Sequence, residues 1–149
     1  TDGVRRLLHD SGFPGMKVIQ FAFDSREESD YLPHNYEKNC VVYTGTHDND
    51  TLCGWYKVLD PEDLKLSQKY MNNANTPKRQ IHWDFIRLAL ASVADLCIIP
   101  LQDYLGLGSE ARINTPSTLG NNWRWRMTQG CLTKELADQI RELTTLYGR

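Results

Sequence analysis

The sequence lacks a C-x-x-C pair, because its four cysteines, Cys40, Cys53, Cys97 and Cys131, stand far apart along the 149 residues. Four cysteines with this spacing indicate neither a structural zinc site nor a dense disulfide framework. Free thiols in a reducing compartment are the expected state, which favours a cytoplasmic protein. The chain begins at Thr1 without an initiator Met or a signal-type segment, so we expect its true N-terminus to lie elsewhere.

Long apolar runs and clusters of basic residues are absent as well. No apolar run reaches the ~18 residues that a membrane-spanning helix needs. The net charge of -2 is spread along the chain, whereas nucleic acids and anionic membranes bind concentrated Lys and Arg, so neither partner is expected. A neutral ligand fits better. The 10% of aromatic residues, including four Trp, would suit the faces of sugars, although most should belong to the core.

Common catalytic and cofactor patterns are also missing. No Ser/His/Asp or Cys/His arrangement stands out, and no Gly-rich loop has the spacing that cradles phosphate groups. A metal site is not indicated, because His47 has two carboxylates nearby but no second His at ligand spacing. We therefore expect neither a metal nor a cofactor.

Strand-like and helix-like segments alternate along the chain. Strands are predicted over residues 17–23, 40–46 and 96–101, and helices over residues 2–11, 61–73 and 81–96 and after Thr133, the expected cap of the last helix. The strand at 40–46 is apolar without clean alternation, which is typical of a strand covered on both faces in a parallel sheet. The helix at 81–96 is apolar nearly all round, which indicates packing between other elements.

This alternation predicts an α/β fold with a parallel sheet and a site at the carboxyl ends of the strands. A (β/α)8 barrel needs about 250 residues. Residues 1–149 are therefore expected to be a single partial domain, the C-terminal part of such a TIM barrel with about three βα units, or else a small open α/β domain. An excised piece would leave strand edges uncovered, and we expect either self-association through those edges or origin from a nicked or truncated parent protein.

The sharpest motif is Thr44-Gly-Thr-His-Asp-Asn-Asp50, which places His47 and Asp48 directly after a predicted strand. In glycosyl transfer the transition state resembles an oxocarbenium ion, and carboxylates and hydroxyl-binding groups near the anomeric carbon lower its energy. The same residues would equally serve as a strand-end turn. Retaining transfer also needs a nucleophile and an acid/base, and nothing in the sequence presents both.

Four blocks carry a family resemblance: Gly12-Phe-Pro-Gly-Met-Lys-Val-Ile-Gln-Phe-Ala-Phe23, Leu32-Pro-His-Asn-Tyr36, Tyr43-Thr-Gly-Thr-His-Asp-Asn-Asp-Thr51 with Gly54-Trp55, and Gly108-Ser-Glu-Ala-Arg112 with Asn122-Trp123. In order and spacing they resemble the amylomaltases, bacterial relatives of the plant disproportionating enzyme. The resemblance extends along nearly the whole chain. Several blocks in the right order are far more specific than any one of them.

The resemblance implies a (β/α)8 barrel of the α-amylase clan that transfers 1,4-linked glucan segments between maltodextrins, starch or glycogen chains without a cofactor. It implies that Asp48 is the third carboxylate, which holds and distorts the donor sugar, and that His47 binds hydroxyls of that sugar. Phe21 and Asn114 match positions that contact glucan in relatives. The nucleophilic Asp and the acid/base Glu of the family lie upstream of Thr1, so the chain alone is expected to be inactive.

Departures and alternatives remain at this point. Relatives commonly read Arg-Met-Asn, any residue, then Pro-Gly where this chain has Arg112-Ile-Asn-Thr-Pro-Ser117, and Ser25 occupies a place that is acidic in some members. These differences affect loop shape and any secondary glucan surface, and they leave His47 and Asp48 untouched. The alternatives are an α-glucan hydrolase of the same clan and a non-catalytic maltodextrin-binding module.

Overall fold

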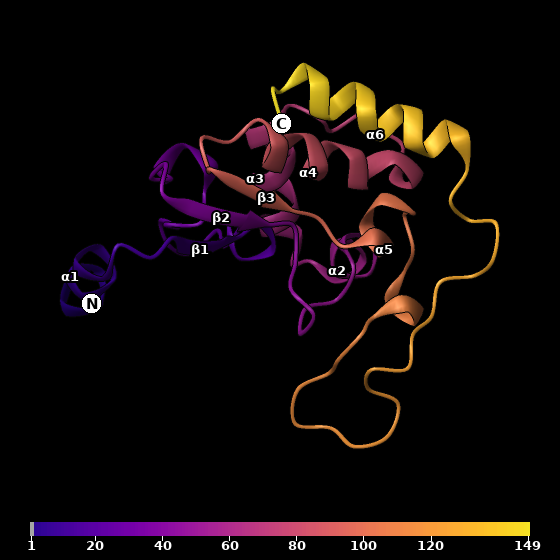
Figure 1. The fold of residues 1–149 in the computed structure, drawn as a ribbon, viewed down its shortest axis with the longest axis horizontal. Helices are drawn as coiled ribbons and strands as arrows, with labels where there is room; N and C mark the ends of the chain where they lie inside the picture. The colour runs from indigo at the N-terminus through magenta and orange to yellow at the C-terminus, as the bar shows by residue number, and fades with distance from the viewer. Residues whose placement is uncertain (1) are drawn as a thin grey trace.

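A parallel sheet of three strands forms the centre of the computed structural model, which describes residues 2–149 (Figure 1). The strands β1 (Gly15–Val18), β2 (Cys40–Tyr43) and β3 (Leu96–Ile98) lie in the order β1-β2-β3. All pairings are parallel, and the register aligns Met16 with Val41 and Val41 with Leu96. The predicted α/β class and parallel sheet are confirmed, and the carboxyl ends of all three strands lie at one edge.

Six α-helices accompany the sheet within the described residues. They are α1 (Asp2–Ser11), α2 (Leu52–Val58), α3 (Pro61–Met71), α4 (Ile81–Leu90), α5 (Leu101–Tyr104) and α6 (Lys134–Leu146). Four single turns of 3-10 helix lie between them: η1 (Ile19–Phe21), η2 (Pro33–Asn35), η3 (Lys78–Gln80) and η4 (Ser109–Ala111). None of the helices in residues 2–149 is long and apolar enough to cross a membrane.

The caps expected from the sequence define two of these helices. The Asp60 side chain accepts a hydrogen bond of 2.9 Å from the backbone N–H of Glu62, with Pro61 at the first helical position of α3. Oγ1 of Thr133 accepts from the N–H of Leu136 at 3.2 Å and begins α6. The predictions of α1, α3 and α6 are confirmed.

Several predicted boundaries are wrong. The first strand ends at Val18 because the chain turns into η1, where the N–H of Ala22 donates to the carbonyl of Ile19 at 3.0 Å. Helix α4 ends at Leu90, and the hydroxyl of Ser92 donates back to the carbonyl of Ala89 at 2.8 Å. Strand β3 ends at Ile98, two residues before a proline that cannot donate to a ladder.

The core lies on one face of the sheet, between the strands and α4. Val42 of β2 and Phe85 and Ile86 of α4 are fully buried there. Helix α6 packs on the outer side of α4 and adds Leu143 to the core (Figure 1). The expectation that α4 packs between other elements is therefore confirmed.

Most of the opposite face of the sheet is uncovered within residues 2–149, although Val18 at the end of β1 is fully buried there. Met16 and Leu96 are each 57% exposed and Ile98 is 45% exposed, while Val41 and Tyr43 are only partly buried. The expectation that the second strand is covered on both faces is therefore wrong for this chain by itself. An apolar sheet face of this kind requires a further layer to bury it.

Candidate active site

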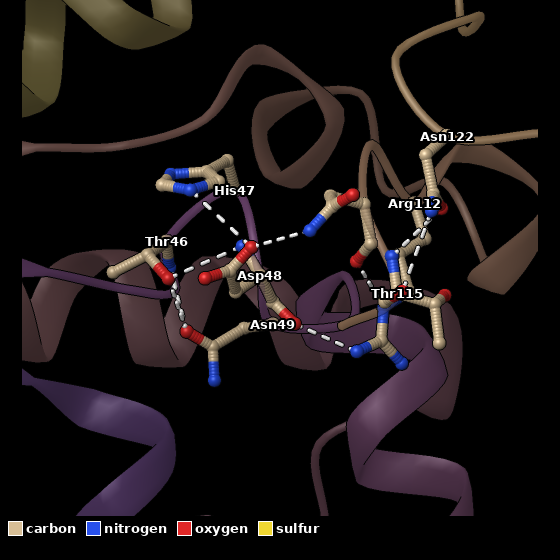
Figure 2. Close-up of polar contacts among 8 residues, drawn as sticks. Thr46, His47, Asp48, Asn49, Arg112, Thr115 and Asn122 are labelled. Carbon is tan, nitrogen blue, oxygen red and sulfur yellow. Dashed lines mark hydrogen bonds and ion pairs between the residues drawn. The ribbon is translucent and has the colours of Figure 1, made fainter. Parts of the chain in front are cut away.

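The loop between β2 and α2 presents His47 and Asp48 at the carboxyl edge of the sheet (Figure 2). Its shape comes from Asn49, whose Oδ1 accepts hydrogen bonds from the backbone N–H and the hydroxyl of Thr46 at 2.9 and 2.8 Å. The N–H of Asn49 donates to the carbonyl of Thr46 at 3.1 Å. A strand-end turn was the other interpretation of residues 44–50 in the sequence, beside a catalytic role. The structure contains the turn, and the turn is also what exposes the two side chains.

His47 and Asp48 form a contact at the tip of this turn. Nε2 of the imidazole lies 3.2 Å from Oδ1 of the carboxylate, and both side chains are about half exposed. Groups with this exposure remain solvated and accessible to a ligand. An imidazole nitrogen and a carboxylate oxygen side by side can bind adjacent hydroxyl groups of a polyol.

A second segment, residues 112–114, holds the pair from the other side. The guanidinium of Arg112 donates to the carbonyl of Asp48 at 2.6 Å and to the carbonyl of Asn114 at 2.9 Å. Asn114 donates twice, from its backbone N–H to the carbonyl of His47 at 3.1 Å and from Nδ2 to Oδ1 of Asp48 at 2.6 Å. Among the described residues Oδ2 of Asp48 accepts no hydrogen bond, so one carboxylate oxygen is held and the other is free.

Trp123 lies against His47 in an uncommon backbone conformation. Its ring centroid is 5.1 Å from that of His47 with a tilt of 34°, and its φ is 64°. A bulky residue with positive φ is an outlier that the surroundings must hold in place, and such residues gather at functional sites. Here the N–H of Trp123 donates to the carbonyl of Ile113 at 2.7 Å, and Oδ1 of Asn122 accepts from the N–H of Thr115 at 3.0 Å (Figure 2).

Phe21 is not part of this contact network. Its side chain, 49% exposed on η1, packs edge-on against Tyr31 with centroids 5.5 Å apart. Its neighbour Gln20 does reach the loop, because Nε2 of Gln20 donates to the carbonyl of Asp50 at 2.7 Å. Gly45 is required for that approach, since a Cβ at this position would lie 2.5 Å from Nε2 of Gln20.

Asp103 is the buried carboxylate beneath the loop. Its Oδ2 accepts from the hydroxyl of Thr44 at 2.6 Å, and its Oδ1 accepts from the N–H of Leu52 at 2.8 Å. Only 2% of the residue is exposed. Burial raises the pKa of Asp103 from its ordinary value of 3.8 to about 6, with the two hydrogen bonds lowering it and the charge of Asp50 raising it.

Within this chain the rim borders one small cavity and one wide, open hollow. A cavity of about 30 Å³ lies beside His47 and Arg112. An open hollow of about 560 Å³ adjoins Arg112 and is lined also by Asp50, Asn122 and Trp125. Cavities of about 600 and 670 Å³ lie elsewhere, one beside Asn73 and Gln139 and the other beside Lys57. Sugar sites normally surround most of the ligand, so residues 46–123 can supply only one wall of such a site.

Comparison with known proteins decides the family. The sequence profile described as 4-alpha-glucanotransferase matches residues 1–133. The chain belongs to the 4-alpha-glucanotransferase family. The 4-alpha-glucanotransferase of Clostridium butyricum is 51% identical over 140 residues, which are 93% of this chain and 28% of that protein. The chloroplastic/amyloplastic 4-alpha-glucanotransferase of Arabidopsis thaliana is 46% identical over 152 aligned residues, which are 100% of this chain and 26% of that protein. The chain thus spans about a quarter of these curated family members.

A solved family member shares the fold. The amylomaltase of Streptococcus agalactiae in complex with acarbose superposes with a TM-score of 0.92 at 38% identity, over 100% of this chain and 30% of that one. The three βα units therefore correspond to part of the (β/α)8 barrel of a 4-alpha-glucanotransferase, and the predicted fold class is confirmed.

The structure brings together three of the four site residues predicted from the sequence. His47, Asp48 and Asn114 are in direct contact, although the chain between them contains most of the helices. Phe21 stays outside that group. Sequence reasoning gave no role to Arg112, Trp123 or Asp103. The available signal for Asp103 was its place just after a predicted strand, and the signal for the other two was the family block that contains them.

Proposed function

We propose that the complete protein containing this chain is a 4-alpha-glucanotransferase that moves 1,4-alpha-glucan segments between maltodextrins or starch-type chains with retention of configuration. The observation that carries the proposal is the state of Asp48: Asn114 holds Oδ1, which also lies beside His47, and Oδ2 has no hydrogen-bond partner among the described residues. A carboxylate held in this way is ready to bind a donor sugar without further reorganisation.

In this proposal Asp48 and His47 act on the donor glucose unit. Positive charge develops at the anomeric carbon and ring oxygen as the glycosidic bond breaks, and a nearby carboxylate stabilises it. Hydrogen bonds from the sugar hydroxyls to Asp48 and His47 strengthen as the ring flattens. Phe21 lies on η1, directly after the carboxyl end of β1, and is half exposed. We propose that it contacts glucose units of the glucan beyond the donor unit.

Bond making and bond breaking are assigned to residues outside this chain. A retaining transfer requires a carboxylate that bonds to the anomeric carbon while an acid protonates the leaving oxygen. An acceptor hydroxyl then displaces the carboxylate and gives its proton to the conjugate base of that acid. We assign neither role to a residue of this chain. The 149 residues alone are therefore proposed to be inactive.

The domain proposal follows from the uncovered sheet face. Residues 1–149 are proposed to be one part of a single catalytic barrel, and the apolar side chains of Met16, Leu96 and Ile98 are proposed to face its interior. The remaining strands of the barrel would bury that face and complete the glucan site.

Product analysis of the complete protein with maltotriose tests the proposal. Transfer yields glucose together with a ladder of longer maltodextrins, whereas a hydrolase of the same clan gives only shorter products. The chain by itself should yield no products from maltotriose. Maltodextrin binding by the chain alone at millimolar concentration would favour a binding module in place of the enzyme.

A further inference from the structure

The loop that carries Asp48 has both of its ends tied to one side chain. Residues 45–51 connect Thr44, which follows the last residue of β2, to Leu52, the first residue of α2. Thr44 donates its hydroxyl to Oδ2 of Asp103 at 2.6 Å, and Leu52 donates its N–H to Oδ1 at 2.8 Å. A single carboxylate therefore sets the distance between the two points where the loop begins and ends.

The position of Asp103 makes this tie stiff. Thr44 and Leu52 are fully buried and Asp103 is 2% exposed, so water does not compete for these hydrogen bonds. Asp103 is itself fixed by α5, where its N–H donates to the carbonyl of Pro100 at 3.0 Å. The position of the loop after β2 is therefore fixed relative to the segment after β3.

Other contacts act within the loop and not on its ends. Gln20 holds the carbonyl of Asp50 at 2.7 Å, and Ser109 donates its hydroxyl to Oδ2 of Asp50 at 2.6 Å. Neither of them sets the separation of the strand end from the helix start. Because catalytic groups must be placed within about 0.5 Å, the element that fixes this separation also fixes Asp48.

We infer that Asp103 is a positioning residue, which places Asp48 for glucan transfer by holding both ends of residues 45–51. This inference rests on the proposed function, since it assigns the placement of Asp48 within that site. Asp103 touches no substrate in this account, and its effect passes through the geometry of the loop.

Two substitutions in the complete protein separate geometry from charge. Asp103→Asn keeps both ties, because its amide oxygen accepts from Leu52 and its amide nitrogen donates to the hydroxyl oxygen of Thr44. Asp103→Ala removes both. We expect kcat/KM for maltotriose, per folded molecule, to fall about 30-fold or more in Asp103→Ala and to stay within about 3-fold of the wild type in Asp103→Asn. Thr44→Val, which removes one tie, serves if Asp103→Ala does not fold, and about a 5-fold loss is expected there.

A double-mutant cycle with Asp48 tests placement itself. Acarbose, present in the solved amylomaltase complex, is the probe, and its Kd is measured by calorimetry. In the wild-type background Asp103→Ala should raise this Kd about 10-fold. In the Asp48→Asn background it should raise the Kd by less than about 2-fold, because the carboxylate that Asp103 places is already absent. Asp84→Ala is the matched control, since it removes a 2.8 Å hydrogen bond from Asn73 in the helix layer and should change stability without changing kcat/KM per folded molecule.

Hydrogen exchange keeps the inference separate from the function. Asp103→Ala should increase amide exchange in residues 45–52 and leave α6 unchanged, whether or not the protein transfers glucan. A wild-type protein without transfer activity would refute the proposed function. Full kcat/KM in Asp103→Ala, equal Kd changes in the two backgrounds, or an Asp103→Asn variant as impaired as Asp103→Ala would each overturn the inference.

Discussion

Asn114 and Asp48 are 66 positions apart in the sequence and are joined by a 2.6 Å hydrogen bond from Nδ2 to Oδ1. The bond links the loops that follow two neighbouring parallel strands, β2 and β3. The two carboxylate oxygens of Asp48 therefore differ, because Oδ1 is held by Asn114 and Oδ2 is left for a ligand.

Removing this bond should slow transfer without unfolding the protein. A hydrogen bond to a charged group contributes about 1.5–3 kcal/mol, so Asn114→Ala should lower kcat/KM for maltotriose about 10- to 100-fold. Asn114→Asp should lower it further, because two carboxylates would then repel each other. Steady-state kinetics measure both variants, and an Asn114→Asp protein as active as the wild type would contradict the role of Asn114.

Gly54 should not tolerate a side chain, although it lies within helix α2. A Cβ there would lie 2.4 Å from Oγ of Ser109 and 2.6 Å from the carboxylate of Asp50. Overpacking of this kind costs about 1–3 kcal/mol, more than the roughly 0.5–1 kcal/mol that alanine gains over glycine in a helix. Chemical denaturation should show Gly54→Ala destabilised. Gly3→Ala in α1, where nothing lies within 4 Å, is the control and should not be destabilised.

Stability should depend on pH through Asp103. Its pKa rises from 3.8 in the unfolded chain to about 6 in the fold, so the folded protein binds this proton more tightly. The resulting contribution is fully present below about pH 4 and is lost as the pH rises through 6, and it amounts to about 3 kcal/mol. The titratable groups that face Asp103 are Asp50 and the thiol of Cys53.

Asp103→Asn removes this titration and gives the comparison. The unfolding free energy of the wild type relative to this variant should decrease between pH 4 and pH 7, as followed by urea denaturation at each pH. A constant difference across that range would show that Asp103 does not titrate with a raised pKa.

The chain expressed alone should self-associate. Strands β1 and β3 are the edges of the sheet, and the face that carries Met16, Leu96 and Ile98 is apolar and uncovered. Light scattering should report dimers or larger species at micromolar concentration. Ile98→Lys, which places a charge on that face, should reduce the apparent mass, and a wild-type chain that remains monomeric would contradict the expectation.

The parts of the fold that follow from local sequence were predictable. Asp60 followed by Pro61, and Thr133 before an apolar stripe, are start signals that depend on side chain to backbone hydrogen bonds a few residues away. The ends of β1 and α4 were not predictable, because residues 19–23 and 91–94 remain mostly apolar after the element stops. Helices α2 and α5 are seven and four residues long, too short for periodicity to indicate.

The site was predictable only in part for a related reason. His47 and Asp48 are adjacent in the sequence and follow a strand, so their exposure at the rim could be inferred. The ties from Arg112 to Asp48 and from Asp103 to Thr44 cross between strands, at separations of 64 and 59 positions. Such contacts depend on strand order and register, which the sequence pattern leaves open.

The most direct test of the account replaces Asp48 by asparagine in the complete protein and follows maltotriose disproportionation. Asp48→Asn keeps the size of the side chain and removes the charge, so glucose and longer maltodextrins should form about 100-fold or more slowly than with the wild type. Asp95→Asn is the control. Asp95 is a surface carboxylate near Lys38 and directly precedes β3, so it lies at the amino ends of the strands, away from the site. This variant should retain full activity. An Asp48→Asn protein that builds the same ladder of products at the wild-type rate would contradict the account.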